Sequence, residues 1–358
     1  MKFNLEIPIN SVSLGQIGYG ICYELFKRKI KPNIFPIGDV DLSAFLPDSN
    51  FDFWLRSCIQ NAQDDFTKYP TIKHWHLNGS ERVVGRGKQI LWTPHELSEI
   101  TPTEAAVCSN FDQVLVTSHY SKDVFKKGGV DTDVCPNFFD SRHFYEVSVP
   151  QAGKYNWGIF GKLEKRKHTR NAIVAWANKY GGDQDHRLLC QVFNPFLDKA
   201  AQGHEINSWF GGNCPWNITF YPFQQRNSDL NTLFNSVDIV LGLSGAEGWN
   251  LPLHTCLGLG KHAVVLDATG HKEFANSENS TLLEPSGMED SSDGIFFHKG
   301  AKFNQGQIYN FTQNRAWEGF EKALDKLKTC GKVNVAGRAT QSFTVSQTVD
   351  KLLTYVDN

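Results

Sequence analysis

The chain has 358 residues, more than a single hydrophobic core usually organises, and this length predicts about two domains. Its 36 Lys and Arg side chains nearly balance its 38 Asp and Glu side chains, so no global field would gather nucleic acid or an anionic membrane. Residues 1–10 lack the basic start and apolar run of a signal peptide, and no stretch reaches the roughly 18 apolar residues of a membrane span. We therefore expect a cytoplasmic protein with no membrane span.

Short β-branched runs alternate with stretches of helical period, a pattern typical of parallel strands joined by crossover helices. In the first half, strands are expected at Lys2–Ile7, Asn33–Ile37, Ile72–Leu77, Gln89–Thr93 and Gln113–Thr117. Helices are expected at Gly18–Lys29, at Phe51–Asp65 and from Pro102, which follows a Thr101 cap.

The same alternation starts again after the loose, polar segment Ser141–Lys154. Strands are expected at Trp157–Phe160, Leu188–Phe193, Ile218–Tyr221, Ile239–Leu243 and Ala263–Leu266, and helices at His168–Tyr180, Trp317–Lys328 and Val345–Val356. The restart predicts one Rossmann-like domain over residues 1–150 and a second over residues 151–335. The helix within residues 336–358 is expected to pack back toward the first domain.

The most informative stretch runs from Ser244 to Pro252 and joins an apolar strand to a helix. Backbone N–H groups at a helix start bind phosphate well, and small residues let an anion approach the main chain. A carboxylate there would repel phosphate, so Glu247 is expected to accept hydrogen bonds from sugar hydroxyls instead. The alternative is a glycine-rich turn that caps an ordinary helix.

A second stretch, Phe160–Lys167, follows the first strand of the second half and is rich in basic side chains. Its position predicts an anion site, and a solvated basic helix start is the alternative. The N-terminal stretch Leu14–Gly20 is glycine-rich and is expected to form a loop between the first strand and the first helix. Such a turn would also suit a dinucleotide-binding domain, but no acidic residue closes the strand Asn33–Ile37 to bind an adenosine ribose.

Glu247-Gly248-Trp249-Asn250-Leu251-Pro252 resembles the E-G-F-G-L-P segment of retaining GT-B glycosyltransferases of the large family 4-like group (glycosyl transferases group 1). The segment Phe160–Lys167 resembles the G-R-L-x-x-x-K segment of the same family, and Leu14–Gly20 resembles its G-G-I-G loop. The resemblance implies an α/β fold of the GT-B type, with two Rossmann-like, doubly wound parallel-sheet domains facing an interdomain cleft. The first domain would bind the acceptor and the second the nucleotide sugar.

The resemblance also implies roles for single residues. Glu247 would contact the donor sugar, and Thr255 stands where the family usually has a glutamate that binds the nucleotide ribose. The residues expected at the donor phosphates are Gly15, Gln16, Lys162, Lys167, Trp249, Asn250 and Leu251.

Catalytic candidates in the first half are His76, His95, Glu96 and His119, which lie near expected strand ends. Position favours His95 with Glu96, because they follow a strand end where the family often has a His-Asp pair or an acidic residue close to the reacting sugar. The alternative is a loop histidine that caps a backbone group.

The resemblance implies a hexosyl- or pentosyltransferase that moves a sugar from a donor such as a UDP- or GDP-sugar to a glycan or another hydroxyl acceptor, with retention. No metal or other cofactor is expected, because lysines and main-chain amides would meet the phosphate charge. A metal-dependent enzyme is the alternative, because the sequence contains three D-x-D pairs: Asp39/Asp41, Asp131/Asp133 and Asp183/Asp185. The sequence is also compatible with a bacteriophage-type enzyme that glycosylates hydroxymethylated DNA bases, with a nucleotide-sugar isomerase or hydrolase, and with an inactive sugar-binding scaffold.

Overall fold

The computed structural model describes residues 2–62 and 66–357. By its internal contacts the chain divides into two units. The first comprises Met1–His143, His298–Gly306 and Gln341–Asn358, and the second comprises Phe144–Phe297 and Gln307–Thr340. This division falls a few residues before the expected boundary at residue 150. The expected domains at residues 1–150, 151–335 and 336–358 stay a prediction.

The first unit is built on a parallel sheet with the strand order β2-β1-β3-β4-β5-β6. Each strand expected in this half is present, because the β-branched runs pair in register over their central residues. The elements are β1 (Asn4–Ile7), α1 (Ser13–Lys27), β2 (Asn33–Pro36), α2 (Ser49–Asn61), β3 (Thr71–His74), β4 (Gln89–Thr93), α3 (Pro102–Cys108), β5 (Gln113–Val116), α4 (His119–Lys127) and β6 (Asp133–Val134).

Helix α1 begins earlier than the sequence predicts, so the expected loop at Gly15 and Gln16 is wrong. The helix begins at Ser13, and both residues lie in its first turns. A Cβ added to Gly15 would collide with the side chain and backbone nitrogen of Asn10, and one added to Gly18 would collide with the carbonyl oxygen of Pro8. Glycine therefore lets the helix pack closely on the segment that precedes it.

Helix α2 begins behind an Asp48 cap, whose carboxylate accepts hydrogen bonds from the amides of Asn50 and Phe51. It ends at Asn61, and the last part of the expected helix, residues 63–65, lies outside the described residues. Helix α3 begins as expected at Pro102, behind Thr101 in a capping box with Glu104.

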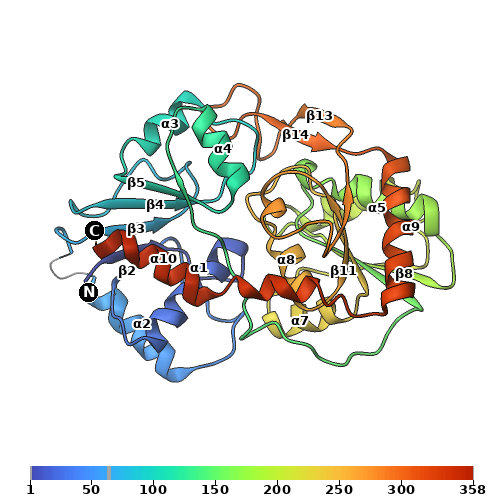
Figure 1. Cartoon of the computed structure of the whole chain (residues 1–358), viewed down its shortest axis with the longest axis horizontal. Helices are drawn as coiled ribbons and strands as arrows, with labels where there is room; N and C mark the ends of the chain where they lie inside the picture. The colour runs from blue at the N-terminus through green and yellow to red at the C-terminus, as the bar shows by residue number, and fades with distance from the viewer. Residues whose placement is uncertain (1, 63–65, 358) are drawn as a thin grey trace. The chain divides into compact units, whose positions relative to one another are not determined.

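Two distant segments complete the first unit. Helix α10 (Val345–Asp357) packs against α1 (Figure 1), and the Arg28 guanidinium donates to the carboxylate of Asp350 at 2.5 Å. The segment His298–Gly306 lies against the start of α3, where the backbone nitrogen of Asn304 donates to the Glu104 carboxylate at 2.8 Å. This segment was expected in the second domain.

The second unit has a parallel sheet with the order β12-β11-β10-β7-β8-β9. Its strands are β7 (Tyr155–Phe160), β8 (His186–Gln191), β9 (Ile218–Phe220), β10 (Ile239–Gly242), β11 (His262–Leu266) and β12 (Thr281–Leu283), and a separate antiparallel ribbon contains β13 (Gly287–Asp290) and β14 (Gln307–Asn310). Its helices are α5 (Thr169–Tyr180), α6 (Lys199–Ser208), α7 (Asn227–Asn235), α8 (Leu251–Gly258) and α9 (Gln313–Cys330), with 3-10 turns η1 (Lys165–Lys167) and η2 (Gly270–Glu273). The turn η3 (Gly337–Ser342) follows α9.

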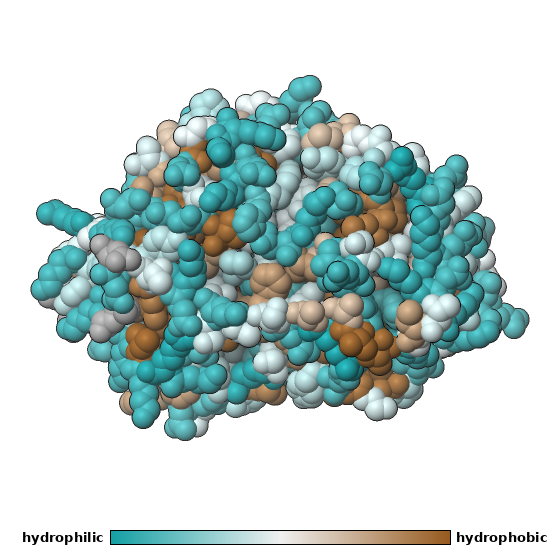
Figure 2. Space-filling model, in the orientation of Figure 1, coloured by the Kyte–Doolittle hydropathy of each residue, from teal (hydrophilic) through white to brown (hydrophobic). Residues whose placement is uncertain are grey.

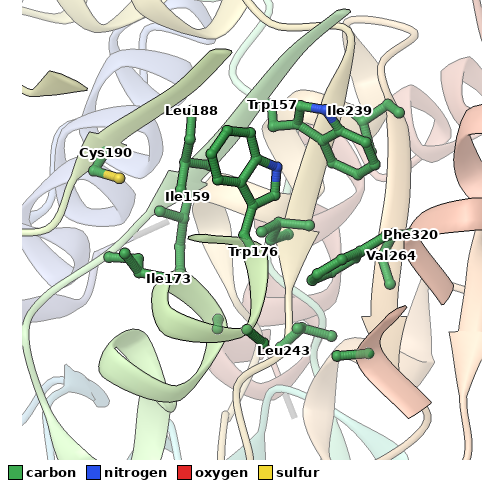
Figure 3. Close-up of a cluster of buried hydrophobic side chains, with 14 of the residues drawn as sticks. Trp157, Ile159, Ile173, Trp176, Leu188, Cys190, Ile239, Leu243, Val264 and Phe320 are labelled. Atoms are coloured by element: carbon green, nitrogen blue, oxygen red, sulfur yellow. The ribbon is translucent and has the colours of Figure 1, made fainter. Parts of the chain in front are cut away.

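The core of the second unit covers this sheet with apolar side chains from α5 and α9 (Figure 3). Trp157 on β7 is fully buried, and Phe320 on α9 meets its ring edge-on at a centroid distance of 5.6 Å. Strands that are covered on both faces have continuous apolar sequences. The positions of these strands could therefore be predicted from the sequence. The two parallel sheets with flanking helices confirm the expected α/β class.

Helices α6 and α7 and the ribbon of β13 and β14 were not expected from the sequence. Helix α6 has little amphipathic pattern, and the ribbon strands are short and largely polar, so neither has a strong local signal. No helix among the described residues is both long enough and apolar enough to span a membrane.

The position of Gly15 inside α1 generates a stability prediction. Gly15→Ala should lower the free energy of unfolding by about 1–3 kcal/mol, because the new methyl group meets Asn10. Gly203→Ala in α6 is the matched control: nothing lies within 4 Å of the added Cβ, so it should raise stability by about 0.5–1 kcal/mol. Urea titration followed by circular dichroism measures both. A Gly15→Ala protein as stable as wild type would contradict the packing role.

Candidate functional site

The strand order of the second unit marks one edge of its sheet as the place for a site. From β7 the chain runs outward through β8 and β9, and then returns to β10 on the other side of β7 before reaching β11 and β12. Strands β7 and β10 are parallel neighbours, so the strand order reverses between them. In open α/β sheets, ligands bind outside the carboxyl ends of the strands at such a point. Both sequence motifs of this half follow these two strands.

A chain of alternating charges joins the two loops at this edge, residues 161–168 after β7 (the β7 loop) and residues 243–250 after β10 (the β10 loop). The Lys167 ammonium lies 2.5 Å from one carboxylate oxygen of Glu247, and the Arg166 guanidinium lies 3.3 Å from the other. Arg166 also lies 2.8 Å from Glu164, which in turn lies 3.4 Å from the ammonium of Lys162. The structure thus brings Lys162, Lys167 and Glu247 together, and their roles at a bound donor stay predictions.

Both carboxylates of this cluster are held in their charged form. Burial raises the pKa of Glu247, but the charges of Lys167 and Arg166 and the hydrogen bond from Lys167 outweigh burial and lower the pKa to about 2. Burial likewise opposes ionisation of Glu164, and the charges of Arg166, Lys162 and Lys167 lower the pKa of its carboxyl. Both carboxylates are therefore ionised at neutral pH.

Arg166 ties the two loops together through the main chain. Its guanidinium donates to the carbonyl oxygen of Ala246 at 2.8 Å, and its own carbonyl accepts from the backbone nitrogen of Gly245 at 2.8 Å. Neither Arg166 nor Glu164 was expected from the sequence to have a role of its own. A signal was present, because Lys162, Glu164 and Arg166 alternate in charge at every second position.

The start of helix α8 follows directly from the β10 loop. Asn250 has a left-handed backbone (φ 81°) and caps the helix, its side-chain oxygen lying 3.3 Å from the backbone nitrogen of Leu253. In the first turn of α8, the Asn250 cap accepts the amide of Leu253, and Pro252 has no N–H group. The remaining first-turn amide is that of Leu251. The Trp249 ring is buried and packs edge-on against His254 at 5.2 Å, so this side chain anchors the loop.

Thr255 lies one turn into α8 and is buried. Its expected contact with a ribose stays a prediction.

A third loop, residues 267–274 after β11, braces Glu247 from its main-chain side. The backbone nitrogen of Gly270 donates to the carbonyl oxygen of Glu247 at 2.8 Å. Beside it, Thr269 has φ 56° and ψ −157°, a conformation that is strained for a β-branched residue. The ring of His271 is fully buried, and its Nε2 donates to the Leu266 carbonyl at 2.5 Å. This loop was not expected from the sequence to belong to the site.

The remaining candidates all belong to the first unit: His76, His95, Glu96, His119, Gly15 and Gln16. His95 follows β4, and its Nε2 donates to the carbonyl oxygen of Glu99 at 2.8 Å. Burial lowers the pKa of His95, which keeps the ring neutral. This contact matches the alternative of a loop histidine that caps a backbone group. The catalytic roles of His95 and Glu96 and the phosphate roles of Gly15 and Gln16 stay predictions.

No group of three or more His, Cys, Asp or Glu side chains is placed to hold a metal ion within residues 2–62 and 66–357. At least one member of each D-x-D pair has a protein partner: Asp41 accepts from the Ser43 amide, Asp133 from the Tyr355 hydroxyl, and Asp185 from the Lys154 ammonium.

Comparison with solved structures shows the fold that carries this site. The sucrose-phosphate synthase of Thermosynechococcus elongatus is 12% identical, with a TM-score of 0.69 over 99% of this chain and 98% of that one. A glycosyltransferase of Rickettsia africae is 12% identical, with a TM-score of 0.70 over the same shares. Anabaena HepE, solved in complex with UDP-glucose, is 14% identical, with a TM-score of 0.63 over 100% of this chain and 99% of that one. The chain therefore has the GT-B fold. No protein-family model matches the sequence, and no curated protein matches it.

The lowered pKa of Glu247 generates a prediction about pH. The carboxyl has a pKa near 4.5 without its partners and about 2 in the folded chain, so its stabilisation is fully present above pH 4.5 and is lost as the pH falls toward 2. Glu247→Gln should therefore lower the melting temperature at pH 7, through a loss of up to about 3 kcal/mol. The difference in melting temperature between Glu247→Gln and wild type should become smaller as the pH falls from 5 to 2.5.

The control for this series is Glu321→Gln. It removes the ion pair between Glu321 and Lys179, in which the Glu321 side chain is 62% exposed. Such a pair contributes little, so its gap to wild type should be near zero at every pH. Differential scanning calorimetry measures both gaps, and a Glu247→Gln gap that is constant with pH would contradict the buried ionised carboxylate.

Proposed function

We propose that this chain is a glycosyltransferase that takes the sugar from a nucleotide-sugar donor bound at the β7 and β10 loops. The observation that carries the proposal is the cluster of Lys162, Arg166, Lys167 and Glu247 at the reversal of strand order, beside the start of helix α8. Cations and a helix start together suit a diphosphate. The shared fold supports it, and HepE, which has this fold, has been solved with UDP-glucose.

Within this proposal, the ammonium groups of Lys162 and Lys167 and the amide of Leu251 bind the diphosphate. As the bond between sugar and phosphate breaks, negative charge accumulates on the departing diphosphate, and these groups stabilise it without a metal. Glu247 is already ionised and orients Lys167 while accepting hydrogen bonds from sugar hydroxyls. Thr255 would contact the ribose in place of a glutamate.

The finer points of the proposal come from the family resemblance. We propose transfer with retention to a glycan or another hydroxyl acceptor, from a UDP- or GDP-sugar carrying a hexose or a pentose. The near balance of charge favours a neutral acceptor over hydroxymethylated DNA. A cytoplasmic location is part of the same proposal.

Donor turnover tests the function directly. Incubation of the protein with a panel of UDP- and GDP-sugars and hydroxyl acceptors should release free nucleotide from one donor, and release should persist in excess chelator because lysines meet the phosphate charge. Chromatography of the sugar product separates transfer from hydrolysis and isomerisation. Turnover that appears only with manganese would contradict the metal-free mechanism. Nucleotide binding without turnover of any donor would instead indicate the inactive scaffold.

Lys167 should matter more to the rate than to ground-state binding. Lys167→Ala should lower kcat by about two to three decades, because removing one preorganised partner of developing charge costs about 2–4 kcal/mol. Lys179→Ala is the matched control: its ammonium also pairs with a carboxylate, at 2.6 Å from Glu321, and its side chain is 19% exposed against 14% for Lys167. Steady-state kinetics with the cognate donor measures both variants. Equal kcat values for the two would place the reacting phosphate elsewhere.

A further inference from the structure

An exposed aromatic ring lies beside the proposed diphosphate site. Strand β8 is the neighbour of β7, and the backbone nitrogen of Gly161 in the β7 loop donates to the Gln191 carbonyl at the end of β8 at 3.1 Å. The loop after β8, residues 192–198, therefore starts next to the β7 loop. Its Phe196 ring has the Lys162 ammonium 5.0 Å from its centroid.

The turn that presents Phe196 is firmly held. Pro195 restricts its own backbone, and the Leu197 amide donates to the Asn194 carbonyl at 3.2 Å across the turn. Asn194 also accepts the Phe196 amide on its side-chain oxygen at 3.1 Å. Gln202 of α6 anchors Asn194 from both sides, accepting its backbone N–H at 2.7 Å and donating to its carbonyl at 3.0 Å.

This rigid turn thus exposes an apolar ring to solvent. Phe196 is 59% exposed. Hydrophilic residues make up most of the face of the molecule that Figure 2 shows. An exposed aromatic ring in a preorganised turn suits a ligand with a flat face.

We propose that Phe196 is the stacking platform for the base of the donor nucleotide. This inference rests on the proposed function, which puts the diphosphate at Lys162 and Lys167. A base attached through the ribose to that diphosphate would extend along the same edge of the sheet, toward β8. Every nucleobase has an aromatic face, so stacking would bind pyrimidines and purines alike.

The chain offers a closely matched control. Trp216 is also 59% exposed and also has a cation over its ring, the Arg187 guanidinium at 4.3 Å. It precedes β9, and Arg187 lies near the start of β8, so this pair belongs to the opposite edge of the same sheet. The two rings differ in their position relative to the proposed site.

Isothermal titration of the full chain with UDP, GDP and inorganic pyrophosphate tests the proposal, because pyrophosphate has the phosphates without a base. Phe196→Ala should weaken binding of the nucleotide that wild type prefers by roughly 5- to 150-fold, the range measured for base–aromatic stacking. It should leave the affinity for pyrophosphate unchanged. Phe196→Tyr should retain the nucleotide affinity, and Trp216→Ala should match wild type with every probe.

Three outcomes would overturn this inference alone: wild-type nucleotide affinity in Phe196→Ala, an equal loss for pyrophosphate and nucleotide, or an equal loss in Trp216→Ala. An equal loss for pyrophosphate would mean that the ring acts by holding Lys162. A wild-type protein that binds neither UDP nor GDP would overturn the proposed donor together with the platform. Circular dichroism of each variant confirms that the fold is intact, which is expected because both rings are largely exposed.

Discussion

The burial of the Glu247 carboxylate is the constraint on which the site of the second unit depends. At 4% exposure an ionised carboxylate must be paired, and its partners, Lys167 and Arg166, come from a loop some 80 residues earlier in the chain. The β7 and β10 loops are therefore held against each other wherever the carboxylate is charged. The amide of Gly270 fixes the same residue from a third loop. Glu247 thus connects three loops that are separate in the sequence.

The sheet determines where this network forms. Because β7 and β10 are adjacent and parallel, the loops that follow them emerge side by side, and helix α8 begins within the same group of residues. The large side chains of the core, such as Trp157 and Phe320, hold the strands in that order. The site is thus a consequence of the strand order, while its chemistry depends on the side chains in the loops.

The charges of the cluster leave a modest local excess. Lys162, Arg166 and Lys167 face Glu164 and Glu247, so three cations against two carboxylates leave one net positive charge beside a helix start. In a chain whose formal net charge is −2, this local excess is what can attract an anion. Cations already oriented by carboxylates need little rearrangement when charge develops nearby, which is the condition for electrostatic stabilisation of a transition state.

The sequence by itself determined what depends on local pattern: the alternation of strands and helices, the strand Gln89–Thr93 at its full length, and the loops that contain Lys162, Lys167 and Glu247. Only the tertiary structure decided that Gly15 lies inside a helix, because a glycine needed for close packing has the same local signal as one in a turn. It also decided that Arg166 joins two loops and that His298–Gly306 packs with the first unit. These features depend on contacts between residues far apart in the chain, which no local pattern encodes.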